Sequence, residues 1–232
     1  MAGNFIDSMK NKTDYLTEQE IDRMLTYCYD NGRMRDFMLI LTLFRTGRRI
    51  SEIVGEKPYT RNVGLRPIDI RFDEGLIEFD ILKKNPVKII AKSGRRRNPL
   101  ILKEMRIKKL PKRKLIPVDE GYLDSIKKYV DIENIGLRKR IFPLHRTRVN
   151  QIIWDVTSAC RIARPNQKIH PHSMRHSFAI NFLKKNEDNP AALIHLQYLL
   201  DHGDLRTTAI YAQFTPSDMR KSLEKAHGDM EH

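Results

Sequence analysis

The stretch IDIRFDEGLIEFDIL (residues 68–82) decides the fold, because apolar and polar residues alternate in it on both sides of a turn. The turn is Asp73-Glu74-Gly75. The alternating apolar residues are Ile68, Ile70 and Phe72 before it, and Ile77, Phe79 and Ile81 after it. A period of two around a short turn predicts a β-hairpin. KLIPVD (114–119) predicts a third strand, which would complete a small sheet.

The segments before this sheet have helical periodicity instead. LTEQEIDRMLTYCYD (16–30) places Thr17 and Glu20 at the spacing of a capping box. MRDFMLILTLFRTG (34–47) is apolar almost all round, which predicts a central helix that stops at Gly47. A short helix with Ser51 as a possible cap follows it. The helices expected after the sheet lie at 119–130, at 147–163, from near 172, at 190–201, near 211 and at 215–228. The predicted fold class is therefore α+β: mainly helical, with one small antiparallel sheet inserted after the third helix.

Nearly all the net charge lies in one segment. The chain carries +14, and residues 83–114 hold 14 Lys/Arg against one acid, Glu104, which accounts for +13. Such a block suits a polyanion, because each neutralised phosphate releases counterions. A solvated loop and a membrane-surface patch are the alternatives, but membrane patches usually form amphipathic helices. The Pro and Gly residues and the runs VKII and PLIL favour nucleic acid.

Composition excludes several other classes of protein. No apolar run approaches the roughly 20 residues that span a bilayer, and the first residues contain no signal-peptide core. Cys28 and Cys160 lie far apart on apolar stretches that are predicted to be helical. They are interpreted as buried thiols in a reducing compartment.

Three short motifs contain candidate functional residues: TGRRISE (46–52), HPHSMRHSFA (170–179) and LLDHGDLRTTAIY (199–211). Each is weak alone, since an Arg in a turn is usually a surface charge and a Tyr on a helix is usually core. His172 and His176 have metal-ligand spacing, but no HExxH or CxxC motif accompanies them. Tyr198, Tyr122 and Tyr129 are predicted to be core residues.

Together, in this order and around a basic sheet, the motifs resemble the catalytic domain of the tyrosine recombinases, or phage-integrase family. The resemblance covers roughly residues 14–228, leaving 1–13 as an extension and 229–232 as a tail. It implies a catalytic set of Arg49, Lys84, His172, Arg175, His202 and Tyr211. Lys83 is the alternative to Lys84 at the turn after the second strand. Glu52 and His176 are expected to orient residues that contact phosphate, and Arg48 occupies a variable position of the pattern.

The chemistry can also be argued from the residue types. A tyrosine hydroxyl can store a broken phosphodiester bond as a phosphotyrosine. Because its pKa is about 10, it needs a base at neutral pH. Planar, permanently charged guanidinium groups suit the phosphate oxygens, which is the role assigned to Arg49 and Arg175. Lys84 would protonate the leaving 5′-oxygen, His172 would manage the tyrosine's proton, and His202 would donate to a non-bridging oxygen.

The sequence thus predicts a DNA recombinase or integrase that works through a 3′-phosphotyrosine, without metal, ATP or another cofactor. The alternatives are a type IB topoisomerase and a non-catalytic DNA-binding protein derived from an integrase. The partner is double-stranded DNA, with a monomer free in solution, a dimer or tetramer on DNA, and no membrane. The expected location is the cytoplasm, on the nucleoid. The residues assigned to DNA contact in the basic insertion are Arg95, Arg96, Arg97, Lys108, Lys109, Lys112 and Arg113.

Most family members also carry an N-terminal helical DNA-clamping domain, which the residues before the first expected helix do not match. A truncated protein and a minimal enzyme that binds DNA with one lobe both fit. In the second case the basic insertion would compensate. The target sequence, the biological task (integration, excision or dimer resolution) and delivery of Tyr211 in cis or in trans stay open.

Overall fold

A computed structural model describes residues 15–55, 63–81, 112–162 and 169–201. The chain divides into two compact units, which are described separately: one holds residues 1–48 and 152–232, the other residues 49–151. The predicted fold class is confirmed, because helices dominate and one three-stranded antiparallel sheet follows the third helix.

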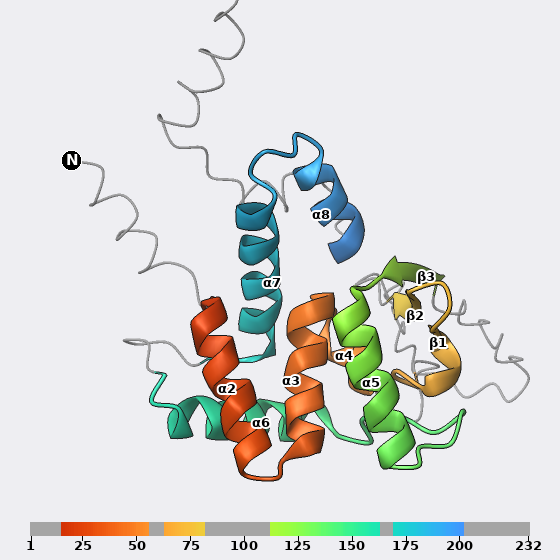
Figure 1. The fold of residues 1–232 in the computed structure, drawn as a ribbon, viewed down its shortest axis with the longest axis vertical. Coiled ribbons are helices and arrows are strands. Elements are labelled where there is room, and N and C mark those ends of the chain that lie inside the picture. The colour runs from red at the N-terminus through yellow and green to blue at the C-terminus, as the bar shows by residue number, and fades with distance from the viewer. Residues whose placement is uncertain (1–14, 56–62, 82–111, 163–168, 202–232) are drawn as a thin grey trace, which may run out of the picture. The chain divides into compact units, whose positions relative to one another are not determined.

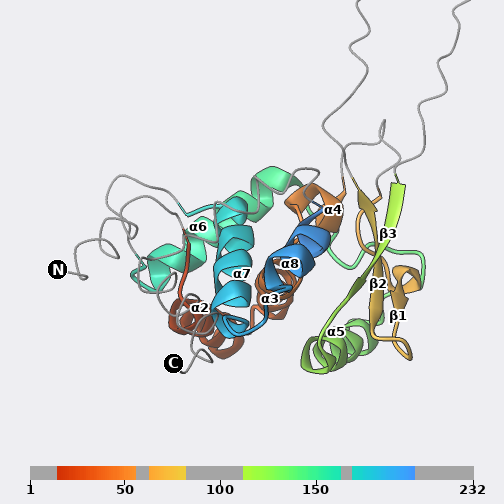
Figure 2. The same cartoon turned by 90° about the horizontal axis from the view of Figure 1, so that it is seen from above.

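The first unit contains a layer of packed helices (Figures 1 and 2). Helix α3 (Met34–Thr46) packs against α2 (Glu18–Asp30) and α7 (Pro171–Lys185), and α7 packs against α8 (Ala192–Leu200). The predicted capping box is confirmed, with the Thr17 side chain and Glu20 bonding each other's backbone. The central position of α3 is confirmed too, because its residues 38–43 are all buried.

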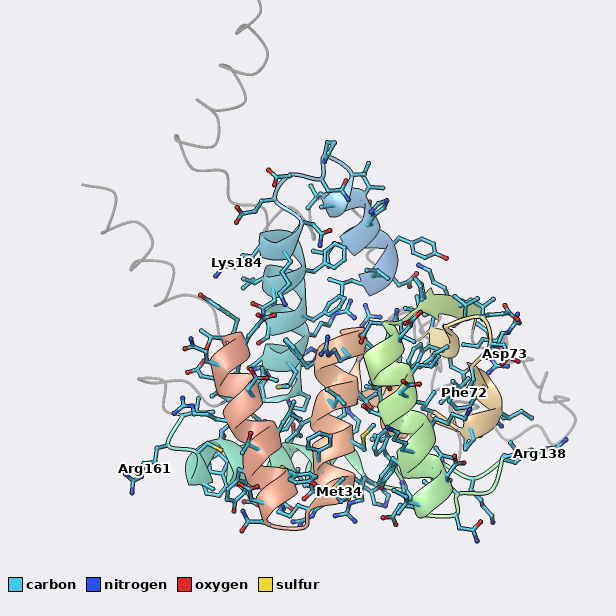
Figure 3. All side chains as sticks on the ribbon, viewed as in Figure 1. Met34, Phe72, Asp73, Arg138, Arg161 and Lys184 are labelled. Carbon is cyan, nitrogen blue, oxygen red and sulfur yellow. The ribbon has the colours of Figure 1, made fainter. Side chains whose placement is uncertain are left out.

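Helix α8 shows one apolar stripe to the core. Ala192, Leu196 and Leu200 are buried at successive turns, and Phe178 and Phe182 of α7 pack against this stripe. The start of α2 is tied to α7 as well, since the backbone N–H of Leu16 donates to Ser177 Oγ at 2.6 Å. Lys184 projects from the end of α7 (Figure 3), with its ammonium 5.5 Å from the ring centroid of Tyr15.

The second unit is built around the predicted hairpin. Strands β1 (Ile70–Arg71), β2 (Leu76–Ile81) and β3 (Lys112–Pro117) lie in the order β1-β2-β3, with Ile77 opposite both Ile70 and Ile116 (Figure 2). The inward residues Ile77, Phe79 and Ile81 are buried, as their alternation predicts.

Helices flank this sheet within the same unit. Helix α4 (Ile50–Val54) contacts β2, and α5 (Glu120–Ile132) lies beside the sheet in both views. Lys127 of α5 reaches within 5.8 Å of the ring centroid of Phe72, at the β1–β2 turn (Figure 3). Tyr122 and Tyr129 are buried on α5, so both are confirmed as core residues. Helix α6 (Arg146–Ala159) contains the boundary between the units.

Several local predictions are wrong for identifiable reasons. Ile68 lies in the 3-10 turn η1 (Pro67–Asp69), which Pro67 starts, and its side chain is exposed. Tyr198 is 55% exposed, because the buried stripe of α8 runs along the other face of the helix. Ser51 is not the cap of α4, since the helix begins one residue earlier and Arg49 takes that position.

The thiols are free in the structure. Cys28 is fully buried, and burial raises the pKa of its thiol to about 11. Cys160 differs from the prediction, because it follows the end of α6 and is only half-buried. Within the described ranges no helix is both long and apolar enough to cross a membrane.

Candidate active site

Arg175 is a candidate residue whose side chain is buried and hydrogen-bonded. It is 6% exposed in the first turns of α7, a helix that starts with Pro171, where the missing N–H is not needed. Its Nη1 donates to the Gly47 carbonyl at 2.8 Å, and its Nη2 donates to the Leu200 carbonyl at 2.5 Å. The two acceptors belong to the ends of α3 and α8, so the guanidinium is held by two helix C-termini. Such ends carry partial negative charge and favour a cation.

Arg48 is held in a similar way in the same unit. Its side chain is fully buried, and its Nη1 donates to the Leu199 carbonyl at 2.8 Å. Arg48 and Arg175 thus bond consecutive carbonyls of the last turn of α8. The chain leaves this turn through Asp201, which adopts the left-handed conformation (φ 52°, ψ 43°) and precedes His202.

The histidines cluster at the start of α7. His172 is exposed three residues before Arg175, whereas His176 is half-buried. The ring of His170 lies 5.9 Å from that of His172 in an edge-to-face arrangement. The His170 backbone N–H donates to Ser173 Oγ at 3.2 Å, which fixes the start of the helix. His172 is therefore accessible and lies on the same helix turn as Arg175.

Arg49 begins the second unit and is paired with Glu52. The carboxylate of Glu52 is fully buried, and it accepts from the Arg49 backbone N–H at 3.1 Å and from Nη1 at 3.0 Å. The Arg49 side chain is 29% exposed, so the guanidinium is oriented by an acid but still reaches solvent. This geometry fits the expectation that Glu52 orients Arg49.

Arg113 has a different environment from the one that its place in the basic segment suggested. On β3 it lies opposite Asp80, and its guanidinium contacts Asp69 at 2.5 Å, Glu78 at 2.8 Å and Asp80 at 3.3 Å. Burial raises the pKa of Asp80, while the neighbouring Arg113 opposes this shift. Three carboxylates therefore engage this arginine at the base of the basic insertion.

Other candidates lie outside the described residues. These are Lys83, Lys84, Arg95, Arg96, Arg97, Lys108, Lys109, His202 and Tyr211. Lys112 begins strand β3. The structure therefore places Arg175 and His172 on one helix turn in the first unit and the Arg49–Glu52 pair in the second, and the remaining assignments stay predictions.

Sequence reasoning missed two features of the site. Nothing in TGRRISE distinguishes the buried Arg48 from a surface arginine, because its acceptor lies 151 residues away. The partners of Arg113 did leave a signal: Glu78 and Asp80 alternate on β2 opposite a basic strand. Cross-strand pairing of opposite charges could have been predicted from that pattern.

The described residues form a mainly helical domain with a small antiparallel sheet. In it, Arg48 and Arg175 donate to carbonyls at the C-terminal ends of helices. Comparison with known proteins agrees with this description. The profile of the phage integrase family matches residues 14–217, so the chain belongs to the phage integrase family.

Individual proteins resemble the chain over most of its length. Tyrosine recombinase XerA of Thermococcus kodakarensis is 26% identical over 219 residues, which cover 91% of this chain and 62% of that protein. The chain thus spans about three fifths of the length of this curated relative.

Solved structures share the fold at lower identity. The catalytic domain of bacteriophage HP1 integrase matches with a TM-score of 0.57 and 19% identity, covering 95% of this chain and all of that one. The Tn1549 transposon integrase in complex with transposon right end DNA matches with a TM-score of 0.61 and 19% identity, covering 91% and 65%. The chain therefore has the catalytic-domain fold of the tyrosine recombinases.

Proposed function

We propose that the chain is the catalytic part of a site-specific DNA recombinase, which cuts and rejoins strands through a 3′-phosphotyrosine. The observation that carries the proposal is the way in which the two motif arginines are held. Arg175 is fixed by the Gly47 and Leu200 carbonyls. Arg49 is fixed by the buried Glu52. Guanidinium groups that are already oriented need little reorganisation when a phosphate develops charge in the transition state.

The proposed reaction needs no external energy source. The Tyr211 hydroxyl attacks the scissile phosphorus while the bond to the 5′-oxygen breaks, so one phosphodiester replaces another. The tyrosine's proton passes to His172, which is exposed at the start of α7. The leaving oxygen takes a proton from Lys84, with Lys83 as the alternative. The reverse sequence, with a 5′-hydroxyl of another strand as the attacking group, completes the exchange.

The partner in this proposal is double-stranded DNA. The basic insertion at 83–114 supplies charge for the phosphate backbone. A similar protein, the Tn1549 transposon integrase, was solved with transposon DNA. The protein would work in the cytoplasm on the nucleoid, as a monomer when free and as a dimer or tetramer on paired sites.

The test is to trap the covalent intermediate. Duplex DNA with a nick near the cleavage point loses a short fragment after cutting, so the tyrosyl adduct cannot be resealed and accumulates. Fragments from a randomised or genomic library supply the target. We expect an adduct whose peptide map contains Tyr211, and none with Tyr211→Phe.

Tyr198→Phe is the matched control, because Tyr198 is an exposed tyrosine of α8 close to Tyr211 in the sequence. An adduct retained by the Tyr211→Phe variant, or mapped to Tyr198, would refute the nucleophile assignment. Relaxation of supercoiled DNA without a defined site would instead indicate a topoisomerase. Tight DNA binding with no adduct on any substrate would indicate a non-catalytic DNA-binding protein.

A further inference from the structure

Arg48 is a buried cation that the proposed mechanism does not use. It is the largest fully buried side chain of the described residues, and it is the last residue before the chain passes into the second unit. Its neighbour Arg49 is a catalytic candidate, whereas Arg48 itself matches no required position of the recombinase motif. A fully buried guanidinium is costly unless its charge is compensated. A structural role for Arg48 would account for the cost of burying its charge.

The hydrogen bond from Arg48 to the end of α8 indicates what this role is. Its Nη1 donates to the Leu199 carbonyl, and Arg175 donates to the next carbonyl, that of Leu200. The second bond of Arg175 goes to Gly47, the residue before Arg48. Two guanidinium groups thus connect the Gly47–Arg48 turn to the end of α8 through hydrogen bonds. The C-terminal end of α8 supplies negative partial charge to both of them.

We propose that Arg48 is a positioning residue, which locks the last turn of α8 to the Gly47–Arg48 turn. It thereby fixes the acceptor that orients Arg175 and the point from which the chain continues to His202 and Tyr211. The proposal rests on the proposed function, and it adds a residue that contacts neither DNA nor the reacting atoms. In the recombinase pattern this position is variable, so the motif assigns Arg48 no role.

The proposed reaction is sensitive to small displacements of the groups that take part in it. Arg48 and Arg175 each donate to a carbonyl of the last turn of α8, whose apolar face is packed through Leu196 and Leu200. Packing fixes the apolar face of the helix but leaves the carbonyl direction of its last turn less constrained. A displacement of about 1 Å between reacting groups can lower a rate on the order of 100-fold. DNA affinity should change little, because Arg48 is fully buried.

The test compares Arg48→Met with Arg48→Lys. Methionine is similar in length and apolar, and replacing a buried ion by an apolar side chain is often tolerated. Lysine keeps the charge and one donor for the Leu199 carbonyl. Arg48→Gln is a second removal variant in case Arg48→Met does not fold. Arg45→Met, at an exposed position in the last turn of α3, is the matched control.

Adduct formation is measured in single turnovers at saturating nicked DNA, well below the melting temperature of every variant. We expect Arg48→Met to react on the order of 100-fold more slowly than the unmodified protein, with DNA affinity changed less than about threefold. Arg48→Lys should recover most of the rate, and Arg45→Met should react normally. A residue that only adds stability would not change the rate of fully folded protein.

A double-mutant cycle with Arg175→Lys identifies the route of the effect. If Arg48 acts through the acceptor of Arg175, the double variant should lose less rate than the product of the fold-losses of the two single variants. Multiplicative losses, or normal rates for both removal variants, would overturn the inference. Failure of the unmodified protein to form any adduct would instead remove the proposed function, so the two failures are distinguishable.

Discussion

Arg49 and Arg175 carry the same guanidinium group but are held by acceptors of different charge. Arg49 has the buried carboxylate of Glu52, so part of its charge is already neutralised. Arg175 donates to two carbonyls, each at the C-terminal end of a helix, where partial negative charge favours a cation. Both guanidinium groups are therefore oriented by the protein, Arg49 by an acid and Arg175 by helix ends.

Substitution by lysine tests this at both positions. Lysine keeps the charge but is a point donor, so a lysine in place of Arg175 could not bond Gly47 and Leu200 and also present two donors to phosphate. We expect each of Arg175→Lys and Arg49→Lys to slow single-turnover cleavage on the order of 100-fold or more. Arg45→Lys, at an exposed site, should cleave normally. Rates near the normal value for both variants would show that the two arginines are structural.

Asp80 gives a prediction about pH. Burial raises its pKa above the ordinary value of 3.8, so the folded protein binds this proton more tightly than the unfolded chain does. Stability from this group is then present at low pH and is lost as pH rises through the folded pKa. Asp80→Asn removes the ionisable group, and with it the loss of folding stability at higher pH. Arg113 keeps its contacts with Asp69 and Glu78 in this variant.

We therefore expect Asp80→Asn to denature at a higher urea concentration than the unmodified protein at about pH 7, with the difference shrinking towards about pH 4. Glu74→Gln is the control. Glu74 is 54% exposed and pairs with the exposed Arg71, so its loss should matter little at any pH. A lower midpoint for Asp80→Asn at neutral pH would mean that its ion pair with Arg113 outweighs the burial.

At the scale of single elements, periodicity predicted what local sequence controls. The hairpin and the capping box at Thr17 were correct, because side-chain alternation and caps act over a few residues. The prediction for Tyr198 failed because an apolar helix does not show from its own sequence which face meets the core. The cap of α4 was missed because arginine is not a typical capping residue. The Arg49 backbone N–H and Nη1 both donate to the Glu52 carboxylate.

Gly47 illustrates an element boundary that tertiary packing also fixes. It ends α3 with φ 58°, and a Cβ built there would lie 2.3 Å from a ring carbon of Phe178. Its carbonyl also accepts the bond from Arg175. The position therefore requires glycine for its backbone conformation and for space, while its carbonyl orients a catalytic candidate.

Gly32→Ala separates these requirements from each other. Gly32 has φ 65°, but a Cβ there would meet nothing within 4 Å. We expect Gly32→Ala to cost about 1 to 2 kcal/mol of unfolding free energy, from the left-handed conformation alone. Gly47→Ala should cost more by about another 1 to 3 kcal/mol, because Phe178 must move. Urea denaturation measures both, and equal losses would show that Phe178 adapts freely.

At the scale of the whole molecule, the motif residues are divided between two units that the sequence order does not reveal. The chain leaves the first unit after Arg48 and returns to it within α6, so Arg49 and Arg175 belong to different units. Which residues join which unit depends on contacts between distant segments, and no local pattern encodes them. The family motif names the candidate residues without using those contacts, and their catalytic roles stay predictions.

The basic insertion also affects the molecule as a whole, because it contributes nearly all of the net charge. Arg113 at its base is engaged by Asp69, Glu78 and Asp80, so we expect it to anchor the insertion and contribute little to DNA affinity. Arg95, Arg96 and Arg97 lie in the middle of the segment and are expected to carry the contact with phosphate. Replacing these three by glutamine should weaken binding to all sequences alike.

The measurement is the dependence of DNA affinity on salt concentration. Each lost phosphate contact lowers the slope of log K against log salt by about 0.9, so the triple variant should lose up to about 2.7. A charge-matched control replaces Arg23, Lys128 and Arg161, which are exposed on helices or turns outside the insertion. Its slope should change much less, because non-contacting charges release few counterions. Equal changes in the two triple variants would mean that DNA responds to the overall charge of the protein and not to a contact with the insertion.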